Sequence, residues 1–587
     1  MAHIRVSDHG GGSLDFVQAA YEMLRKNNLL AALIIFLATI GCYGYTANFS
    51  LISDDEVLFQ GKAHLGLLRS IPQYFTSGVW DNILGGKVDG ALYRPMFLIY
   101  VAMLKIVFGN NPFALHAASI VLHATNSVLF LLIASNVFSK SSRLVVMAGT
   151  LSFALHPVHV ESISWISALT DLQATFFILL SFLFYIQNHG ASGLGKYVAS
   201  FACFVFALFS KELAVVFPVV LVAYDYVRRQ LSVKRTVAFV AAAVVYYVCR
   251  LAALSGETVQ SMELKNVDVD QATLLVRFIP AYFKQLVAPV DLPFFMNSPV
   301  LGYLSQLNLA YYGLVLALFI CFVCYVRKDA WWGAAWLFLF LLPPLSLVFC
   351  NMPMLAVRYL YLPSVGFSIV VTMAMEVLYR KIGRPFFGVI VALAVLGGVF
   401  FSYREGQAFR NGFTLGEKIL ASSPESIKGH LFLASFHENN NNLAMSLVSL
   451  RNAYKAVKMV EEKAEACYSL GLFLVKNNNL IEGRAYLQEA IGLNLGHSDA
   501  YNALGNSYLI EQDLRAAILY YKEAVAAKEN NYEALYNLAR SYEMAGESKL
   551  AFDSFTSFLR NSPRQQEAEL FSYAENFVQR YNSMYGK

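Results

Sequence analysis

The chain has 587 residues, of which 57% are hydrophobic and only 14% are charged, and its mean hydropathy is +0.48. Soluble domains usually carry about 25% charged residues, so this composition excludes a soluble enzyme, a disordered chain and a nucleic-acid binder. The net charge of +5 is too small to indicate a polyanionic partner.

Eleven apolar runs are interpreted as transmembrane helices, which need about 20 mostly apolar residues each. In chain order they are Leu29–Phe49, Phe113–Phe138, Leu144–Val160, Ile166–Gln187, Tyr197–Ser210, Ala214–Val227, Thr236–Leu254, Leu307–Val326, Trp331–Phe349, Leu360–Tyr379 and Pro385–Tyr403. They divide the chain into an N-terminal cytoplasmic segment, residues 1–28, a membrane domain, residues 29–403, and a polar domain, residues 404–587. The polar domain carries nearly half of all charged residues.

A twelfth apolar segment, Pro95–Phe108, decides the predicted topology. With eleven spans, every basic cluster lies on the side of the N terminus, which the positive-inside rule makes cytoplasmic. The clusters are Arg25/Lys26, Lys140/Arg143, Lys196, Arg228/Arg229/Lys234/Arg235, Arg327/Lys328 and Arg380/Lys381/Arg384. Pro95–Phe108 is therefore interpreted as a re-entrant or interfacial helix. The large loops 51–111 and 255–306 and the polar domain are then expected to face the periplasm or lumen.

Charged and polar side chains gather at the outer ends of the spans, whereas the middle of each span carries no charge. In chain order they are Asp54, Asp55, Arg94, His156, His159, Glu161, Asp171, Lys211, Glu212, Arg358, Tyr359 and Tyr361. Charges on one side favour a catalytic cleft at the interface over a channel filter. The acids that follow the first span suit a general base, a metal ligand or a solvated helix cap.

The polar domain repeats with a period of 34 residues. Lys463–Gly496, His497–Asn530 and Asn531–Arg564 align without gaps, and a poorer copy runs from about Ile427 to Val460. The second copy reads Tyr501-x2-Leu504-Gly505-x2-Tyr508, followed by Ala517, Tyr521 and Ala524. This pattern resembles the tetratricopeptide repeat, a pair of packed helices whose stacked copies form a groove for extended peptides.

Several motifs of the membrane domain also occur in a specific order. They are Asp54-Asp55 after the first span, Tyr93-Arg94-Pro95, Leu155-His156-Pro157-Val158-His159-x-Glu161, Asp171-Leu172, Lys211-Glu212 and Arg358-Tyr359-Leu360-Tyr361-Leu362-Pro363-Ser364. Together with the repeats, this order resembles the transmembrane and tetratricopeptide-repeat-containing O-mannosyltransferases and their bacterial relatives, which are GT-C glycosyltransferases. The resemblance implies an all-α fold, a polytopic membrane bundle of GT-C type with about 11 spans followed by a tetratricopeptide-repeat solenoid.

The resemblance also implies a polyprenyl (or dolichyl) phosphate sugar as donor, and an acceptor protein held by the repeats. Asp54 and Asp55 are then the catalytic candidates, because a carboxylate must take the proton of the acceptor hydroxyl, and the sequence leaves open which one acts. Arg358, Arg94 and Lys211 are candidates to bind the donor phosphate. Arg358 could instead snorkel to the interface, and Lys211 could simply pair with Glu212.

The remaining polar groups are second-loop candidates, namely His156, His159, Glu161, Asp171, Glu212, Tyr359 and Tyr361. A metal site at His156, His159 and Glu161 is disfavoured, because Pro157 breaks the helical spacing and no third nitrogen ligand is evident. If a divalent cation takes part, Asp54, Asp55 and Glu161 are the expected ligands. No other cofactor is expected.

The polar domain contains no Asn-x-Ser/Thr sequon. A single sequon, Asn48-Phe49-Ser50, lies near the outer face at the end of the first span. This favours a bacterial inner membrane with the repeats in the periplasm over an endoplasmic-reticulum membrane with luminal repeats. Two alternative functions remain, a membrane-anchored scaffold for envelope or pilus assembly without catalysis, and a transporter or flippase. A scaffold needs neither the Asp54/Asp55 pair nor Arg358, and a transporter would be expected to show inverted repeats or broken helices.

Overall fold

The computed structural model describes residues 28–60, 70–84, 92–187, 193–254, 269–294, 309–325, 329–346, 356–457, 460–561 and 568–585. Most of the predicted N-terminal segment, the basic clusters Arg25/Lys26 and Arg327/Lys328, and parts of both large outer loops lie outside these residues. Within the described ranges every regular element is a helix. The predicted all-α class is therefore confirmed.

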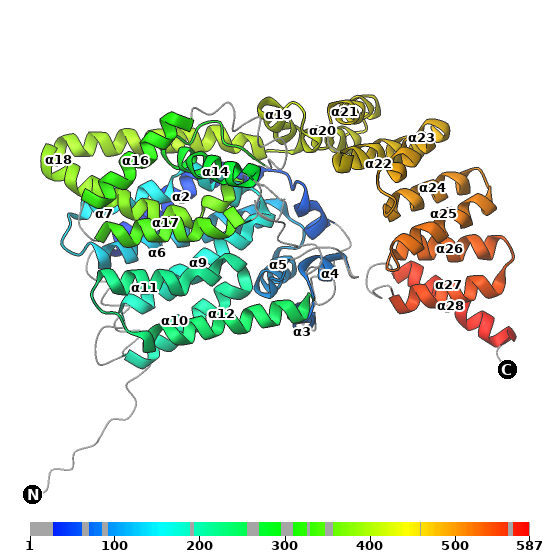
Figure 1. Cartoon of the computed structure of the whole chain (residues 1–587), viewed down its shortest axis with the longest axis horizontal. Coiled ribbons are helices and arrows are strands. Elements are labelled where there is room, and N and C mark those ends of the chain that lie inside the picture. Colours follow the sequence, from blue (N-terminus) through cyan, green and yellow to red (C-terminus); the bar gives the residue numbers. More distant parts are fainter. Residues whose placement is uncertain are drawn as a thin grey trace, which may run out of the picture.

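The membrane domain is a bundle of apolar helices that coincide with the predicted spans to within a few residues (Figure 1). They are α2 (Asn28–Tyr43), α6 (Pro112–Val137), α7 (Arg143–Ala154), α9 (Leu169–Gln187), α10 (Gly193–Ser210), α11 (Phe217–Val227), α12 (Val233–Ala253), α16 (Leu309–Tyr325), α17 (Asp329–Ser346) and α18 (Pro363–Gly406). Six described segments are long and apolar enough to cross a membrane, and four further apolar helices are shorter. The number of crossings stays a prediction.

Element α18 consists of two helices that meet at Gly383, whose φ of 75° interrupts the helical backbone. Glycine adopts this backbone conformation without steric cost. The two halves pack on each other beside the bend, where the rings of Tyr379 and Phe387 are 5.3 Å apart. The first half thus starts, and the second half ends, at the same end of the bundle, as predicted for the last two spans.

The predicted re-entrant segment forms α5 (Pro95–Phe108), which matches its expected bounds. Arg94, just before α5, pairs with Glu212 at the start of η6 (Glu212–Val216). Shortly after α5, His116 of α6 packs on Phe49, which follows η1 (Gly44–Asn48) at the end of the first span. Both ends of α5 therefore lie at one end of the bundle, as a helix that does not cross requires. We call this the pocket end, because the pocket described in the next section lies there.

The polar domain is a solenoid of helix pairs that extends away from the pocket end (Figure 1, yellow to red). Its helices are α19 (Gly412–Ser422), α20 (Ile427–Asn439), α21 (Leu443–Ala456), α22 (Val460–Lys476), α23 (Leu480–Leu493), α24 (Ser498–Ile510), α25 (Leu514–Ala527), α26 (Tyr532–Met544), α27 (Ser548–Asn561) and α28 (Ala568–Tyr585). The motif positions Leu504, Ala517, Tyr521 and Ala524 are fully buried. They fill the seams between helices, as the repeat interpretation predicts.

Asparagine and aspartate side chains cap the helices of the array. The Oδ1 atoms of Asp513 and Asn531 each accept a hydrogen bond of 3.0 Å, from the N–H groups of Ala516 and Ala534 respectively. Such caps satisfy N–H groups that have no partner within the helix. The asparagine-rich segment Asn439–Asn442 joins α20 to α21.

Candidate active site

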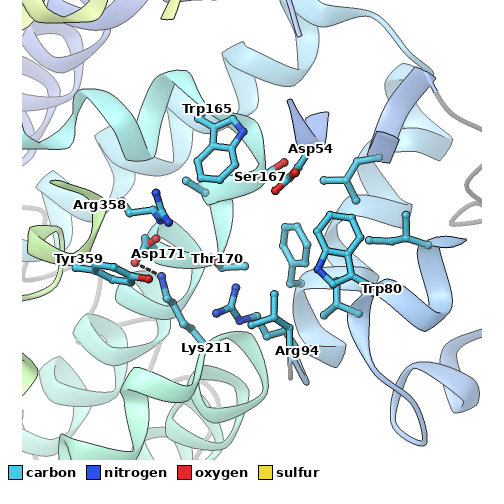
Figure 2. A pocket seen from close by; sticks show the side chains of 16 residues that line it. Asp54, Trp80, Arg94, Trp165, Ser167, Thr170, Asp171, Lys211, Arg358 and Tyr359 are labelled. Atoms are coloured by element: carbon cyan, nitrogen blue, oxygen red, sulfur yellow. Dashed lines mark hydrogen bonds and ion pairs between the residues drawn. The ribbon is translucent and has the colours of Figure 1, made fainter. Parts of the chain in front are cut away.

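A pocket of about 250 Å³ lies at the pocket end of the bundle (Figure 2). Its lining residues are Asp54, Leu58, Val79, Trp80, Ile83, Leu92, Arg94, Phe97, Trp165, Ser167, Ala168, Thr170, Asp171, Lys211, Arg358 and Tyr359. They come from the start of the first outer loop, helices α4 (Val79–Leu84) and α5, the turn before α9, the end of α10, and η8 (Val357–Leu360). Six of the site residues expected from the sequence thus share one pocket.

The pocket has one polar and one apolar wall. Arg358, Lys211 and Arg94 reach into it from one side, and Trp80 lies across from Arg358 and Lys211 (Figure 2). Five apolar side chains also line the pocket, namely Leu58, Val79, Ile83, Leu92 and Phe97. A ligand that is charged at one end and apolar at the other fits such a pocket.

The two adjacent aspartates have different environments. The chain turns at Ser53, which has a φ of 55°, and the half-buried side chain of Asp54 then lines the pocket. Burial raises the pKa of Asp54, while the positive charges of Arg358 and Lys428 act to lower it. The net effect is a raised pKa, and Asp54 lines the same pocket as Arg358.

Asp55, by contrast, is fully buried and is not a lining residue. Its carboxylate accepts hydrogen bonds from the backbone N–H groups of Ile166 (3.1 Å) and Ser167 (2.6 Å), and from the Ser167 hydroxyl (2.5 Å). Burial nevertheless raises its pKa to about 7. These contacts fasten the first outer loop to the turn before α9.

Each cation of the polar wall is paired with a carboxylate. Arg94 donates two hydrogen bonds to Glu212, at 2.9 Å and 2.5 Å, in the bidentate geometry that arginine favours. Burial alone would raise the pKa of Glu212, but Arg94 and Lys211 offset this and hold it at about 2.

The other two pairs are more deeply buried. The ammonium of Lys211 lies 2.6 Å from Asp171, and Arg358 lies 2.5 Å from Glu161. Glu161 also accepts a 2.9 Å hydrogen bond from the backbone N–H of Arg358. Arg358 and Arg94 are thus held in place from behind, because neither Glu161 nor Glu212 is a lining residue, whereas Asp171 lines the pocket together with Lys211. The pairing of Lys211 with Glu212 that the sequence suggested is not formed, because Lys211 pairs with Asp171 and Glu212 pairs with Arg94.

The histidines and Tyr361 expected near the site lie outside the pocket, packed inside the bundle. His159 Nε2 is 2.8 Å from the Ser364 hydroxyl, and His156 Nε2 is 2.9 Å from the carbonyl oxygen of Leu286. The Tyr361 hydroxyl contacts His123 Nδ1 at 2.7 Å and receives a hydrogen bond from Asn126. Sequence reasoning overlooked His123 and Asn126, although polar residues inside an apolar run are a usable signal.

The residues proposed for a divalent cation do not converge. Asp55 is directed to backbone N–H groups and Glu161 to Arg358, which leaves Asp54 alone in the pocket. Across the described ranges, no group of three or more His, Cys, Asp or Glu side chains is placed to hold a metal ion. These residues do not fit a metal centre, and none enters the chemistry derived below.

The comparisons with known proteins agree with both parts of the sequence interpretation. A family model described as tetratricopeptide repeat matches residues 468–532 and 502–565. The human protein O-mannosyl-transferase TMTC2 is 27% identical over 215 residues, which cover 35% of this chain and 25% of that protein. Mouse TMTC4 is 25% identical over 28% of this chain and 24% of its own length.

Among solved structures, the crystal structure of MamA is 24% identical, covers 27% of this chain and 88% of that chain, and superposes with a TM-score of 0.23. The matched part spans only a quarter or less of the length of the curated relatives. The chain carries tetratricopeptide repeats and, over about a third of its length, is similar to the protein O-mannosyl-transferases TMTC1 to TMTC4.

Proposed function

We propose that this protein is a GT-C-type membrane glycosyltransferase that moves a sugar from a polyprenyl-phosphate donor to a Ser or Thr hydroxyl of a protein held by the repeats. The observation that carries the proposal is the pocket in which Asp54 faces Arg358, Lys211 and Arg94. A mannosyl donor is the first to test, because the curated relatives are named O-mannosyl-transferases.

Asp54 is the group suited to act on the acceptor. The acceptor oxygen forms a bond to C1 of the sugar, and its proton passes to the Asp54 carboxylate. The bond between C1 and the phosphate oxygen breaks, and its electron pair leaves with the phosphate. Asp55 cannot take this role in its present position, because its oxygens already accept three hydrogen bonds and it does not line the pocket.

The cations of the polar wall suit the donor phosphate, which gains negative charge as the sugar leaves. Arg358, Lys211 and Arg94 point at the pocket before any ligand arrives, so little reorganisation is needed when this charge develops. Their carboxylate partners keep the empty pocket from carrying three uncompensated buried charges.

The apolar wall supports a lipid-linked donor. Phe97 of α5 lines the pocket, and further along the same helix Met103, Ile106, Val107 and Phe108 are exposed. Exposed apolar side chains on a membrane-domain helix fit a bilayer or a lipid chain. Helix α5 thus carries an apolar side chain in the pocket and exposed apolar side chains at its other end, an arrangement that suits a polyprenyl tail.

The test is transfer of labelled mannose from polyprenyl-phosphate mannose to acceptor protein in reconstituted membranes. We expect Asp54→Asn to lower the rate by roughly 10²–10⁴-fold without lowering the melting temperature. Glu56→Gln is the matched control, since Glu56 lies two residues away and does not line the pocket. Equal rates for wild type and Asp54→Asn would reject this base, and wild-type protein without transfer to any acceptor would favour the scaffold alternative.

The repeats and the pocket are proposed to lie on the same, non-cytoplasmic side of the membrane. The backbone N–H of Ser50, just before Asp54, donates a 3.1 Å hydrogen bond to the carbonyl of Arg410 at the start of the polar domain. We therefore expect a reporter that is active only in the cytoplasm to stay silent when it is fused after Lys587. A strong signal from this fusion would reject the predicted topology.

A further inference from the structure

Asp171 is a buried carboxylate of the pocket for which the proposed reaction has no use beyond its pairing with Lys211. It lies in the first turn of α9, and its side chain is only 3% exposed. Figure 2 shows it beside Lys211, whose ammonium donates a 2.6 Å hydrogen bond to Asp171 Oδ1. Among the described residues, the other oxygen, Oδ2, has no hydrogen-bond partner. Half of this carboxylate is therefore unsatisfied.

An unsatisfied carboxylate oxygen is unfavourable inside a protein. Burial removes the water that solvates the group, and a charged acceptor without a donor keeps the full cost of this desolvation. The charge of Asp171 is compensated by Lys211, so what Oδ2 needs is a hydrogen-bond donor and not a second cation. Because Asp171 lines the pocket, a ligand bound there can supply this donor.

The groups next to Asp171 are those proposed to bind the donor phosphate. The ammonium of Lys211 and the guanidinium carbon of Arg358 lie 5.5 Å and 5.1 Å from the centre of the same ring, that of Tyr359. Lys211 has three N–H groups and gives one of them to Asp171, which leaves donors for a phosphate. Both oxygens of Asp171 are bonded to the same carbon. A group that binds Oδ2 must therefore lie close to the phosphate that Lys211 binds.

We propose that Asp171 binds the sugar of the donor lipid, and that the sugar hydroxyl on C2 donates a hydrogen bond to Oδ2. This inference rests on the proposed function. The phosphate of the donor is attached to C1, and the hydroxyl on C2 is the ring hydroxyl nearest to it. Asp171 is then a substrate-binding residue for the sugar, whereas Lys211, Arg358 and Arg94 bind the phosphate. The spent lipid phosphate has no such hydroxyl, so the pocket distinguishes it from the loaded donor.

The first test uses wild-type, full-length protein in lipid nanodiscs. Its affinity is measured for polyprenyl-phosphate mannose and for the analogue that carries 2-deoxymannose. Only the second lipid lacks the hydrogen bond to a charged group, so we expect it to bind roughly tenfold to a hundredfold more weakly. Equal binding of the two lipids, which is the result if Oδ2 holds only a water molecule, would overturn the proposal without any variant.

The second test assigns the difference to Asp171. In Asp171→Asn, the ratio of the two affinities should fall to about threefold or less, because a neutral hydrogen bond is weaker. Glu212→Gln is the matched control, since Glu212 also pairs with a cation of the pocket but is not a lining residue. It should keep the wild-type ratio even if both affinities change. An unchanged ratio in Asp171→Asn, or an equal fall in Glu212→Gln, would overturn the proposal.

Asp171→Asn breaks a buried ion pair and could prevent folding. The double variant Asp171→Leu/Lys211→Met then replaces it, because an apolar pair of similar volume is usually tolerated where a buried ion pair was. This variant should bind the mannosyl and 2-deoxymannosyl lipids equally, although it binds both more weakly than wild type. If it retained the wild-type ratio, the hydroxyl on C2 would be bound by another residue and the proposal would be wrong.

Binding without an acceptor separates this inference from the proposed function, because no sugar is transferred during the measurement. Wild-type protein that discriminates between the two lipids but transfers mannose to no acceptor contradicts the proposed function alone. Protein that transfers mannose but binds both lipids equally contradicts the role of Asp171 alone.

Discussion

Ion pairs lie in opposite environments in the two parts of the molecule. In the bundle, the side chains of Lys211 and Asp171 are only 4% and 3% exposed, whereas in the array those of Arg451 and Glu482 are 46% and 34% exposed. A buried pair carries a desolvation cost that an apolar pair would not, so it adds little net stability. The buried pairs of the bundle therefore mark the place where we propose that a charged ligand binds, while an exposed pair such as Arg451–Glu482 needs no such explanation.

The largest effect is expected when a buried pair is broken from one side. Arg358→Ala leaves Glu161, whose side chain is 0% exposed, without its cation, and should lower the free energy of unfolding by about 3–5 kcal/mol. The double variant Arg358→Ala/Glu161→Gln should recover much of this stability but no transfer. Denaturation in detergent measures the first effect and the transfer assay measures the second. Equal stability of the single and double variants would show that the pair is not the cause.

Asp55→Asn should have the next largest effect, and on stability more than on chemistry. The new amide group is a donor at the position where the Ile166 N–H also donates, so one hydrogen bond is lost. We expect the free energy of unfolding to fall by about 3 kcal/mol. In wild type, the pKa of Asp55 is raised to about 7, so the folded state binds a proton that the unfolded state has lost above pH 4. The melting temperature should therefore fall from pH 5 to pH 8. A similar fall in Asp55→Asn would assign this dependence to another group.

A smaller effect is expected from a close approach within the array. A Cβ at Gly505 would lie 2.4 Å from the ring of Tyr521, which is buried and donates to Asn506 through its hydroxyl. Gly505→Ala should lower the free energy of unfolding by about 1–2 kcal/mol. It should also reduce transfer to a native acceptor protein, whereas transfer to short peptides should not change. Gly492→Ala is the control, because its Cβ would meet no atom within 4 Å. Equal losses with both acceptors would mean that damage to the array reaches the pocket.

The smallest effect is expected at the exposed pair Arg451–Glu482, whose atoms are 2.9 Å apart. Arg451→Gln should change the free energy of unfolding by no more than about 0.5 kcal/mol, because solvent and salt screen such pairs. A melting curve at low and high salt checks this. A loss as large as that of Arg358→Ala would remove the distinction between the two parts.

The helices and the repeats could be predicted because both signals are local. The apolar run Phe113–Phe138 coincides with α6 to within a residue, and the 34-residue period fixes the pairs from α22 to α27. The bend of α18 was also accessible, since Pro385 cannot donate a helical hydrogen bond and Gly383 lies two residues before it.

The division of roles between Asp54 and Asp55 was not accessible from the sequence. The two residues are adjacent, and their directions depend on a bond between Asp55 and the backbone of Ile166, 111 residues later. His156 and His159 belong to the same motif as Glu161, but only Glu161 supports a pocket residue.

The packing of α19 and α20 on the bundle decides where such a protein can be divided to make a chimera. A new repeat array joined at residue 404 would separate Leu415, Ile419 and Phe432 from the hydrophobic core to which they belong. The graft would expose apolar surface on both sides of the seam. Exchange between α21 and α22 keeps α19 and α20 with the bundle, so the later repeats can be replaced there without disturbing the membrane domain.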